Sequence, residues 1–477
     1  MPNKEPKGPN NAKLQRTTFT VSRELEYFTE KELDREIGDT VYRWPLLITK
    51  ELIDNALDAC ETGTELPVIT VTLDGTRICV ADNGPGLPET TLTESLNYLT
   101  RTSDKAHYVA PTRGQIGNAL KCLWAAPFVY SGVFCDEQLP GRIRVITTRY
   151  ACEIVVAVDK IAQKPILNCN PLDREFVKIG TSIEIEWESQ TSSIPVPSHD
   201  FYKSGDSDGD DEDEDEPDEE NEESAPPRTF ADDLRFLVGG FATFNPHATF
   251  HLCLDGETVT FAASLPNWQK WRTDDLTSPH WYTADDLRTL IAGHISAQNG
   301  TKTVRELVSE FRGLTGTAKQ TQVVNAAGLN RQCLNDLITD DNIDMAKVGA
   351  LLRAMQEASR PVKAVALGLI GEEVLKKQLA EIDCVVPEKI LYYKLPSNNA
   401  KAPTLIEIAF GPQINESNRQ VRLGLNCSPA KDLDLIKGLE SYMQYQLHVD
   451  PDATVSMAVH VMRPGVKFTS RAKSEVV

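Results

Sequence analysis

The chain of 477 residues lacks features that mark several common protein classes. It has no apolar run of about 18 residues, so we expect no membrane span. Its basic, polar N-terminus has no apolar core of the kind a secretory signal needs, which favours a short flexible arm over residues 1–18. Ten cysteines form no CxxC pair and eight histidines form no zinc-type spacing. These absences predict reduced thiols in a cytoplasmic protein, with association with the nucleoid as an alternative.

Basic residues are absent from one strongly acidic run. Residues 206–223 (DSDGDDEDEDEPDEENEE) hold 14 carboxylates, and they account for most of the net charge of −21. The overall acidity therefore says little about partners. Such a run cannot bury apolar surface, so we expect a disordered, solvated loop over residues 203–227. The alternative is a nucleic-acid mimic that competes for basic surfaces.

Length and hydrophobic periodicity predict several domains. A chain this long exceeds what one core normally serves, so we expect two to four domains. Residues 20–60 have helical periodicity, and Asp74-Gly75 is a strong hairpin turn between two β-branched runs. The pattern predicts an α+β sandwich over residues 19–265, with helices on one face of a mostly antiparallel sheet. Its strands are expected at 68–73, 77–81, 142–158 and 181–187.

Two further parts follow. A helix near 230–238 and a strand near 247–254 complete the first domain, and residues 266–385 form a connector and then helical segments. From residue 386 to residue 477 the pattern predicts a C-terminal α/β domain. Its expected elements are strands at 390–395, 404–410, 420–426 and 454–462 and a helix at 433–447.

The first motif with chemical content is ELIDNALDA, residues 51–59. Glu51 and Asn55 are at i and i+4, so they share one face of a helix, with Asp54 and Asp58 on a neighbouring stripe. A carboxylate in this position can orient or deprotonate a water, and an amide oxygen can ligate Mg²⁺. The alternative is an ordinary solvated acidic helix face.

The second motif, residues 80–88 (VADNGPGLP), directly follows a strand. Asp82 at the strand end can accept a hydrogen bond from an exocyclic amine, and Gly84 and Gly86 allow the backbone to approach a ligand closely. The alternative is a plain Asp-Asn-Gly turn.

The third motif, residues 113–121 (RGQIGNALK), is a glycine loop that opens a helix. Free N–H groups at a helix N-terminus favour phosphate, and Lys121 either adds a point charge there or faces solvent. Gly180-Thr181, at the entry of a later strand, supplies a hydroxyl near the sheet. A P-loop has no support, because no GxxxxGK[ST] occurs.

In this order and spacing, these motifs resemble the nucleotide pocket of the GHKL ATPases, which include gyrase-type subunits, Hsp90-type chaperones, MutL proteins and histidine kinases. The resemblance implies a Bergerat-type α/β sandwich that binds ATP and Mg²⁺. It implies that Glu51 is the general base and that Asn55 ligates Mg²⁺. It implies that Asp82 reads the adenine amine, helped through water by Thr181. Other residues implied to line the adenine end or the phosphate lid are Asp58, Gly84, Gly86, Arg113, Gly114, Gln115, Ile116, Gly117, Asn118, Ala119, Leu120 and Lys121.

Within the superfamily, later segments resemble the B subunits of type IIB topoisomerases (topoisomerase VI). Histidine kinases are disfavoured, because residues 1–45 contain no histidine. Residues 242–248 (ATFNPHA) resemble an Asn-Pro-His-Ala segment of those subunits, in which we expect His247 to be a buried structural residue. Residues 311–328 occupy the position of their helix-two-turns-helix insert, and residues 386–477 resemble their ribosomal S5-like transducer domain. There a TSxxK stretch presents a lysine to the ATP γ-phosphate, which here is Lys473; the alternative is an ordinary exposed lysine.

The chain also departs from that pattern. Ala119 stands where the lid tends to have another glycine, which would stiffen the lid. The sequence ends four residues after Lys473, so we expect the helix that docks the DNA-cleaving subunit to be missing. No Toprim-type acidic cluster or nucleophilic tyrosine stands out.

Two functions follow from the resemblance. The first is an ATP-gated, homodimerising clamp that acts on DNA, with a separate DNA-cleaving or effector subunit. The second is an ATPase switch that remodels or scaffolds protein partners. A degenerate module without hydrolysis is disfavoured by the intact Glu51. Contacts with DNA phosphates are expected from the basic residues of the helical segment, unless these only form a solvated face: Lys302, Arg305, Arg312, Lys319 and Arg331.

Overall fold

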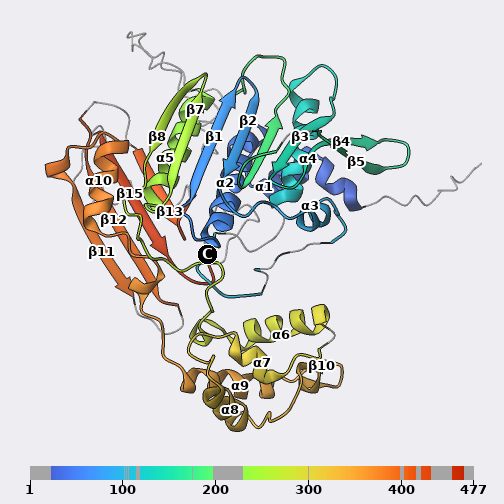
Figure 1. Cartoon of the computed structure of the whole chain (residues 1–477), viewed down its shortest axis with the longest axis vertical. Helices are drawn as coiled ribbons and strands as arrows, with labels where there is room; N and C mark the ends of the chain where they lie inside the picture. The colour runs from blue at the N-terminus through green and yellow to red at the C-terminus, as the bar shows by residue number, and fades with distance from the viewer. Residues whose placement is uncertain are drawn as a thin grey trace, which may run out of the picture.

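The structure, a computed structural model, describes residues 23–100, 103, 105, 107–113, 119–173, 176–196, 229–298, 300–397, 402–414, 420–430 and 454–466. In these ranges the chain is an α+β protein with two mixed sheets and a group of short helices below them (Figure 1). The N-terminal arm, the acidic loop at 203–227 and the helix expected at 433–447 lie outside the described residues.

The N-terminal sheet has eight strands. All neighbouring pairs are antiparallel except β1 and β7, which are parallel, so the sheet is mostly antiparallel, as predicted, but mixed. The predicted hairpin forms, and Asp74 pairs with Arg77 across it. The spatial order is β5 (Lys164–Pro171), β4 (Ala151–Asp159), β3 (Gly141–Thr147), β6 (Thr181–Glu186), β2 (Arg77–Asp82), β1 (Val68–Asp74), β7 (Thr249–Leu254) and β8 (Glu257–Phe261).

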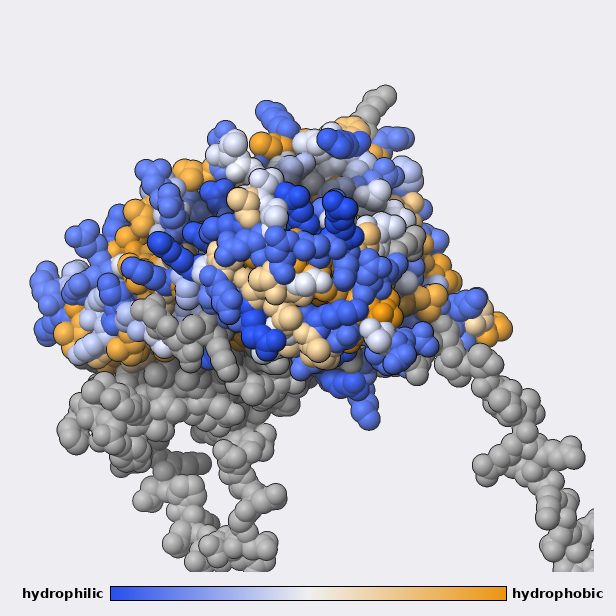
Figure 2. Space-filling model, turned by 90° about the horizontal axis from the view of Figure 1, so that it is seen from below, coloured by the Kyte–Doolittle hydropathy of each residue, from blue (hydrophilic) through white to orange (hydrophobic). Residues whose placement is uncertain are grey.

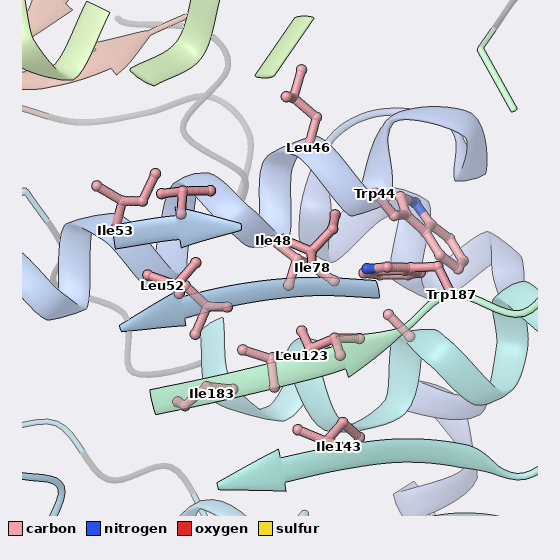
Figure 3. Packing of buried hydrophobic residues seen from close by; sticks show 14 of the residues in the cluster. Trp44, Leu46, Ile48, Leu52, Ile53, Ile78, Leu123, Ile143, Ile183 and Trp187 are labelled. Atoms are coloured by element: carbon pink, nitrogen blue, oxygen red, sulfur yellow. The ribbon is translucent and has the colours of Figure 1, made fainter. Parts of the chain in front are cut away.

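Helices cover one face of this sheet. Alternate strand residues such as Ile78, Ile143 and Ile183 are buried against this helical layer. Figure 3 shows Ile78 next to Ile48 of the long helix that begins at Trp44, and Ile183 and Ile143 nearer to Leu123 of the helix that begins at Ala119. The opposite face carries cross-strand ion pairs, Arg142 with Glu153 and Arg144 with Glu184. The helical layer consists of α1 (Glu30–Ile37), α2 (Trp44–Glu61), α4 (Ala119–Phe134) and α5 (Phe230–Phe244), and α3 (Glu89–Ser95) flanks it.

The helical segment lies below both sheets in Figure 1. Its first helix, α6, falls in the part of residues 266–385 that the sequence assigned to a connector. Leu287, Leu290 and Ile291 of this helix are buried in the large second core, which also contains residues of the C-terminal sheet. Thr303 and Glu306 form a capping box that begins the next helix. The elements are α6 (Ala284–Gln298), α7 (Val304–Ser309), α8 (Thr317–Ala326), a ribbon of β9 (Ile338–Thr339) and β10 (Asn342–Ile343), and α9 (Met345–Ala358).

The C-terminal sheet has five strands, of which β13 and β15 are parallel neighbours. The four predicted strands are present, and α10 (Glu372–Ile382) packs on the sheet. Its spatial order is β11 (Leu391–Ser397), β12 (Thr404–Pro412), β15 (Val455–Met462), β13 (Gln420–Leu425) and β14 (Ser428–Ala430).

Helix α5 packs against both sheets. Leu234, Val238 and Phe241 lie in the core of the eight-stranded sheet, whereas Phe244, at the end of the same helix, lies in the second core. The Phe244 ring stacks on His460 of β15, with ring centroids 5.7 Å apart. The same helix also packs against α10, β13 and β14.

No helix in the described part of the chain has both the length and the apolar character needed to cross a bilayer. Figure 2 views the molecule from the side of the helical segment, where hydrophilic residues predominate among the coloured atoms. Four of the basic residues expected to meet DNA are exposed in this segment: Arg305, Arg312, Lys319 and Arg331. Lys302 is half-buried and pairs with Glu310.

Candidate functional site

Asp82 ends strand β2 beside the start of β6. Its Oδ1 accepts hydrogen bonds from the backbone N–H of Gly84 at 2.8 Å and of Thr181 at 3.3 Å. The Thr181 hydroxyl in turn accepts from the backbone N–H of Leu87 at 2.8 Å. Burial raises the pKa of the Asp82 carboxyl, which the two N–H groups partly offset. The structure therefore brings Asp82, Gly84 and Thr181 together, with one carboxylate oxygen held by the backbone.

Glycine is required where the two loops meet. Gly180 has φ +78°, and a Cβ there would lie 1.8 Å from the carbonyl oxygen of Asp82. Gly86 has φ +87°, and its Cβ would lie 3.3 Å from the carbonyl oxygen of Gly180. The contact at Gly180 leaves no room for a side chain, and at Gly86 the positive φ favours glycine. The glycines hold the Asp82 and Thr181 strands at the separation that these hydrogen bonds need.

Glu51 and Asn55 lie on one stripe of α2, as the i, i+4 spacing predicts. Asn55 is exposed and the Glu51 side chain is partly exposed. The Glu51 Oε1 lies 3.4 Å from Nζ of Lys50. A carboxylate and an amide oxygen are hard donors of the kind that Mg²⁺ prefers, so the donor set on this stripe fits that ion.

Buried charges occupy the neighbouring stripe of the same helix. Asp54, Asp58 and Glu61 succeed one another at i, i+4 and i+7, and all three side chains are largely buried. Arg113, which directly precedes the glycine loop, donates from Nη1 to Asp58 at 2.7 Å and from Nη2 to Glu61 at 2.8 Å. Lys270 of the connector contacts Glu61 at 2.7 Å. We call these five residues the ion-pair cluster.

Three hydrogen bonds, along two paths, join the ion-pair cluster to the C-terminal sheet. Arg113 Nη2 donates to Oδ1 of Asn245 at 2.5 Å, and Asn245 Nδ2 donates to the carbonyl oxygen of Cys427 at 2.7 Å. The Ser428 hydroxyl donates to Oδ2 of Asp54 at 2.7 Å. Helix α2, the base of the glycine loop and the β13–β14 turn therefore meet at one buried polar site.

Two carboxylates of the cluster, Glu61 and Asp58, have lowered pKa values. Burial raises the pKa of the Glu61 carboxyl, but Arg113 and Lys270 outweigh burial and hold this pKa well below its usual range. Burial also raises the pKa of Asp58, and Lys105 and Arg113 reverse that shift. The structure thus places Arg113 and Asp58, both expected in the ATP site, where their charges are already compensated by each other and by their neighbours.

Lys121 differs from both alternatives that the sequence left open. It neither faces solvent nor lies beside the glycine loop as an uncommitted charge. Its side chain is buried, and its ammonium donates to the carbonyl oxygens of Asn97 and Thr100 and lies 5.7 Å from the centre of the Tyr98 ring. The cause is helix geometry, since α4 turns this position toward the segment that follows α3.

The remaining expected lid residues are only partly described. Gly114, Gln115, Ile116, Gly117 and Asn118 lie outside the described residues, as does Lys473. Helix α4 begins at Ala119, directly after the glycine loop, as predicted, and Leu120 packs against the first core. His247 is buried, as expected, and its Nε2 lies 2.9 Å from Glu61.

Sequence reasoning missed the ion-pair cluster as a unit. The i, i+4, i+7 spacing of Asp54, Asp58 and Glu61 was the available signal, because three acids on one stripe of an otherwise apolar helix need partners. Nothing local marks Lys270 or Ser428, which reach the helix from distant parts of the chain.

Residues 46–126 match the family described as "Histidine kinase-, DNA gyrase B-, and HSP90-like ATPase". The match runs from α2 into α4 and includes Glu51, Asn55 and Asp82. This chain carries a GHKL ATPase domain. The family is the one that the motifs resemble, and among the described motif residues Glu51 and Asn55 lie on α2 and Asp82 ends β2.

Several relatives of this chain share one name, that of the B subunit of type 2 DNA topoisomerase 6. The protein from Archaeoglobus fulgidus is 28% identical over 145 residues, which cover 30% of this chain and 23% of that protein. The protein from Methanococcoides burtonii is 22% identical over 466 residues, 92% of this chain and 65% of that protein. The protein from Pyrococcus furiosus is 24% identical over 366 residues, which cover 73% of this chain and 53% of that protein. The chain thus spans less than two thirds of the length of each of these relatives.

Among solved structures, the B-subunit of DNA gyrase from Myxococcus xanthus aligns over 95% of this chain and 88% of its own, at 8% identity and a TM-score of 0.35. The assignment of residues 46–126 to the GHKL ATPases rests on the family match and not on this alignment.

Proposed function

We propose that this protein binds and hydrolyses Mg·ATP in the GHKL domain and uses the cycle to open and close a homodimeric clamp in DNA topology or other DNA transactions. The single observation that supports this most is the fixed Asp82 carboxylate. Its Oδ1 is held by two backbone N–H groups, and no donor from the described residues reaches its Oδ2. That oxygen is suited to accept a hydrogen bond from the exocyclic amine of adenine.

The other roles follow from placement on α2. Asn55 would ligate Mg²⁺ through its amide oxygen, and Glu51 would take a proton from the attacking water. The Thr181 hydroxyl would support adenine recognition through water, and the glycine loop at 114–117 would close over the phosphates. When bound, Mg²⁺ would neutralise phosphate charge, while the chain's own residues orient the water and exclude solvent.

The clamp part of the proposal rests on the likeness to the B subunits of topoisomerase VI. We interpret the helical segment as a helix-two-turns-helix insert and the C-terminal sheet as an S5-like transducer domain, with Lys473 reaching the γ-phosphate. A separate DNA-cleaving or effector subunit would complete the assembly. The exposed basic residues of the helical segment would contact DNA phosphates, and each contact would steepen the salt dependence of binding.

ATP turnover with and without duplex DNA tests the function. We expect wild-type protein to hydrolyse ATP faster with DNA and Glu51→Ala to lose at least about 100-fold in rate, as for loss of a general base. Turnover that ignores DNA would favour a switch acting on protein partners instead. A wild-type chain without turnover would refute the ATPase.

The adenine assignment has its own test. Asp82→Asn keeps the shape of the side chain but places an N–H₂ donor where an acceptor is needed. We expect ATP affinity to fall beyond detection while the melting temperature stays near that of wild type. Retained affinity would remove Asp82 from the adenine site.

A further inference from the structure

A short buried chain of contacts runs from the C-terminal sheet to Glu51. Ser428 Oγ donates to Asp54 Oδ2 at 2.7 Å, and Nζ of Lys50 donates to the same oxygen at 2.9 Å. The same Nζ lies 3.4 Å from Glu51 Oε1. Ser428 and Asp54 are 374 positions apart in the chain, and Asp54 links Ser428 to the ammonium group of Lys50. That ammonium group lies beside Glu51, the proposed general base.

Ser428 is fixed to the C-terminal sheet. It starts β14, and the turn before it contains two residues with positive φ, Asn426 at +49° and Cys427 at +66°. Asn426 is bonded to β15, because its N–H donates to Val461 and its Oδ1 accepts from the N–H of Arg463. The hydroxyl of Ser428 therefore moves with the sheet, while Lys50 and Asp54 move with α2.

We propose that Lys50 is a positioning residue for Glu51, and that Ser428 of the C-terminal sheet controls it by competing for Asp54. This inference rests on the proposed role of Glu51 in ATP hydrolysis. With Ser428 donating, Asp54 Oδ2 is shared, and the Lys50 ammonium stays between two carboxylates. When the sheet withdraws Ser428, Asp54 binds Lys50 alone and draws it away from Glu51. Hydrolysis is therefore fastest in the first arrangement, in which Ser428 of the C-terminal sheet contacts Asp54 of α2.

The surroundings favour this competition over a passive ion pair. Asp54 is almost completely buried and its Oδ1 has no hydrogen-bond partner among the described residues, with Nε of Arg113 3.9 Å away. The Asp54 carboxylate thus depends on Lys50 and Ser428 for direct hydrogen bonds. When one of these partners is lost, the carboxylate interacts more strongly with the other. Burial lowers the pKa of Lys50, but Asp54 and Glu51 raise it to about 12, so the ammonium is charged in either arrangement.

Steady-state ATPase kinetics of full-length variants test the proposal. We expect Ser428→Ala to lower kcat about threefold and Lys50→Met about tenfold, with KM and nucleotide affinity unchanged, because positioning of the base is lost and not binding. Lys50→Arg keeps the charge and should restore most of kcat. In the Lys50→Met background, Ser428→Ala should have no further effect, since the two act through one path.

Ser456→Ala is the matched control. Ser456 is also buried in the C-terminal sheet, where its hydroxyl accepts from Gln413 Nε2 at 2.6 Å, away from Asp54. It should lower the melting temperature but leave kcat unchanged. An unchanged kcat in Ser428→Ala, or an equal Ser428→Ala effect in the wild-type and the Lys50→Met backgrounds, would overturn the relay. If Glu51→Ala hydrolysed ATP at the wild-type rate, the proposed role of Glu51 as general base would fail instead, and a wild-type chain without turnover would refute the proposed ATPase.

Discussion

Arg113 and Asn245 meet at 2.5 Å, guanidinium Nη2 to amide Oδ1, although 132 residues separate them in the chain. Arg113 stands at the base of the glycine loop, and Asn245 caps the end of α5 and binds the carbonyl oxygen of Cys427. Both side chains are almost fully buried. The contact therefore ties the proposed lid to the helix that the two sheets share.

Replacing Arg113 should destabilise the protein strongly. Arg113→Ala would leave Asp58 and Glu61 buried with fewer partners, which costs about 3–5 kcal/mol for a broken buried pair. Arg113→Lys keeps the charge but loses the paired donors of the guanidinium group, and we expect it to recover only part of the lost stability. Denaturant midpoints measure the effect. Arg142→Ala, which removes an exposed pair with Glu153, should change stability by less than about 1 kcal/mol; equal effects at both sites would contradict the prediction.

Gly180→Ala should abolish nucleotide binding as well as lower stability. A Cβ at this position would lie 1.8 Å from the Asp82 carbonyl oxygen, so the strand ends must separate. Gly256→Ala is the control, because it has φ +86° but no atom within 4 Å of its Cβ. It should show only the backbone penalty of about 1 kcal/mol. Thermal melting and ATP titration of both variants separate the backbone penalty from the steric clash with Asp82. Equal losses of stability and of ATP binding in the two variants would refute the close approach at Gly180.

Lys473→Ala should weaken ATP-driven dimerisation without altering the fold. The expectation follows from its proposed contact with the γ-phosphate, since a ligand shifts a conformational equilibrium only through contacts that differ between the states. Sedimentation with a non-hydrolysable ATP analogue gives the dimer fraction. Lys319→Ala, an exposed lysine of the helical segment, serves for comparison. A dimer fraction equal to that of wild type would exclude the switch.

Stability should fall between about pH 6.5 and pH 9. Burial lowers the pKa of His460, but its contacts with Cys427 and Glu407 raise it to about 9. Because the pKa of His460 is higher in the folded than in the unfolded protein, protonation of His460 stabilises the fold. This contribution is complete below the unfolded pKa near 6.5 and is lost as pH rises through about 9. The loss in the free energy of unfolding is at most about 3 kcal/mol. Urea unfolding at pH 6 and pH 9 measures the loss. His460→Gln should reduce this dependence, and an unchanged slope would show that other groups dominate.

Regular elements with one buried face were predictable from the sequence. The β1–β2 hairpin, α2, α5 and the C-terminal strands have apolar residues at the period of their structure. Strands β5 and β8 were missed because nearly all of their residues are exposed or half-buried and leave no alternation. Helix α6 was missed because its buried residues Leu287, Leu290 and Ile291 pack in a core built from distant parts of the chain, which local sequence does not reveal.

The candidate site was predictable where its parts are local. Glu51 and Asn55 share a helix turn, and Asp82 and Gly84 lie two residues apart. The pairing of Asp82 with Thr181 was inferred only by resemblance, and the destination of Arg113 was not foreseen at all. Long-range partners such as Asn245 are set by how α2, α5 and the C-terminal sheet pack, which spacing along the chain does not encode.

Helix α5 bears on how the molecule melts. Because Phe241 lies in one core and Phe244 in the other, with a single turn between them, neither sheet can come apart without exposing apolar surface of the other. Calorimetry should therefore record one heat-absorption peak for both sheets. Truncation of Phe244 should broaden or divide that peak, leaving two bodies that denature separately.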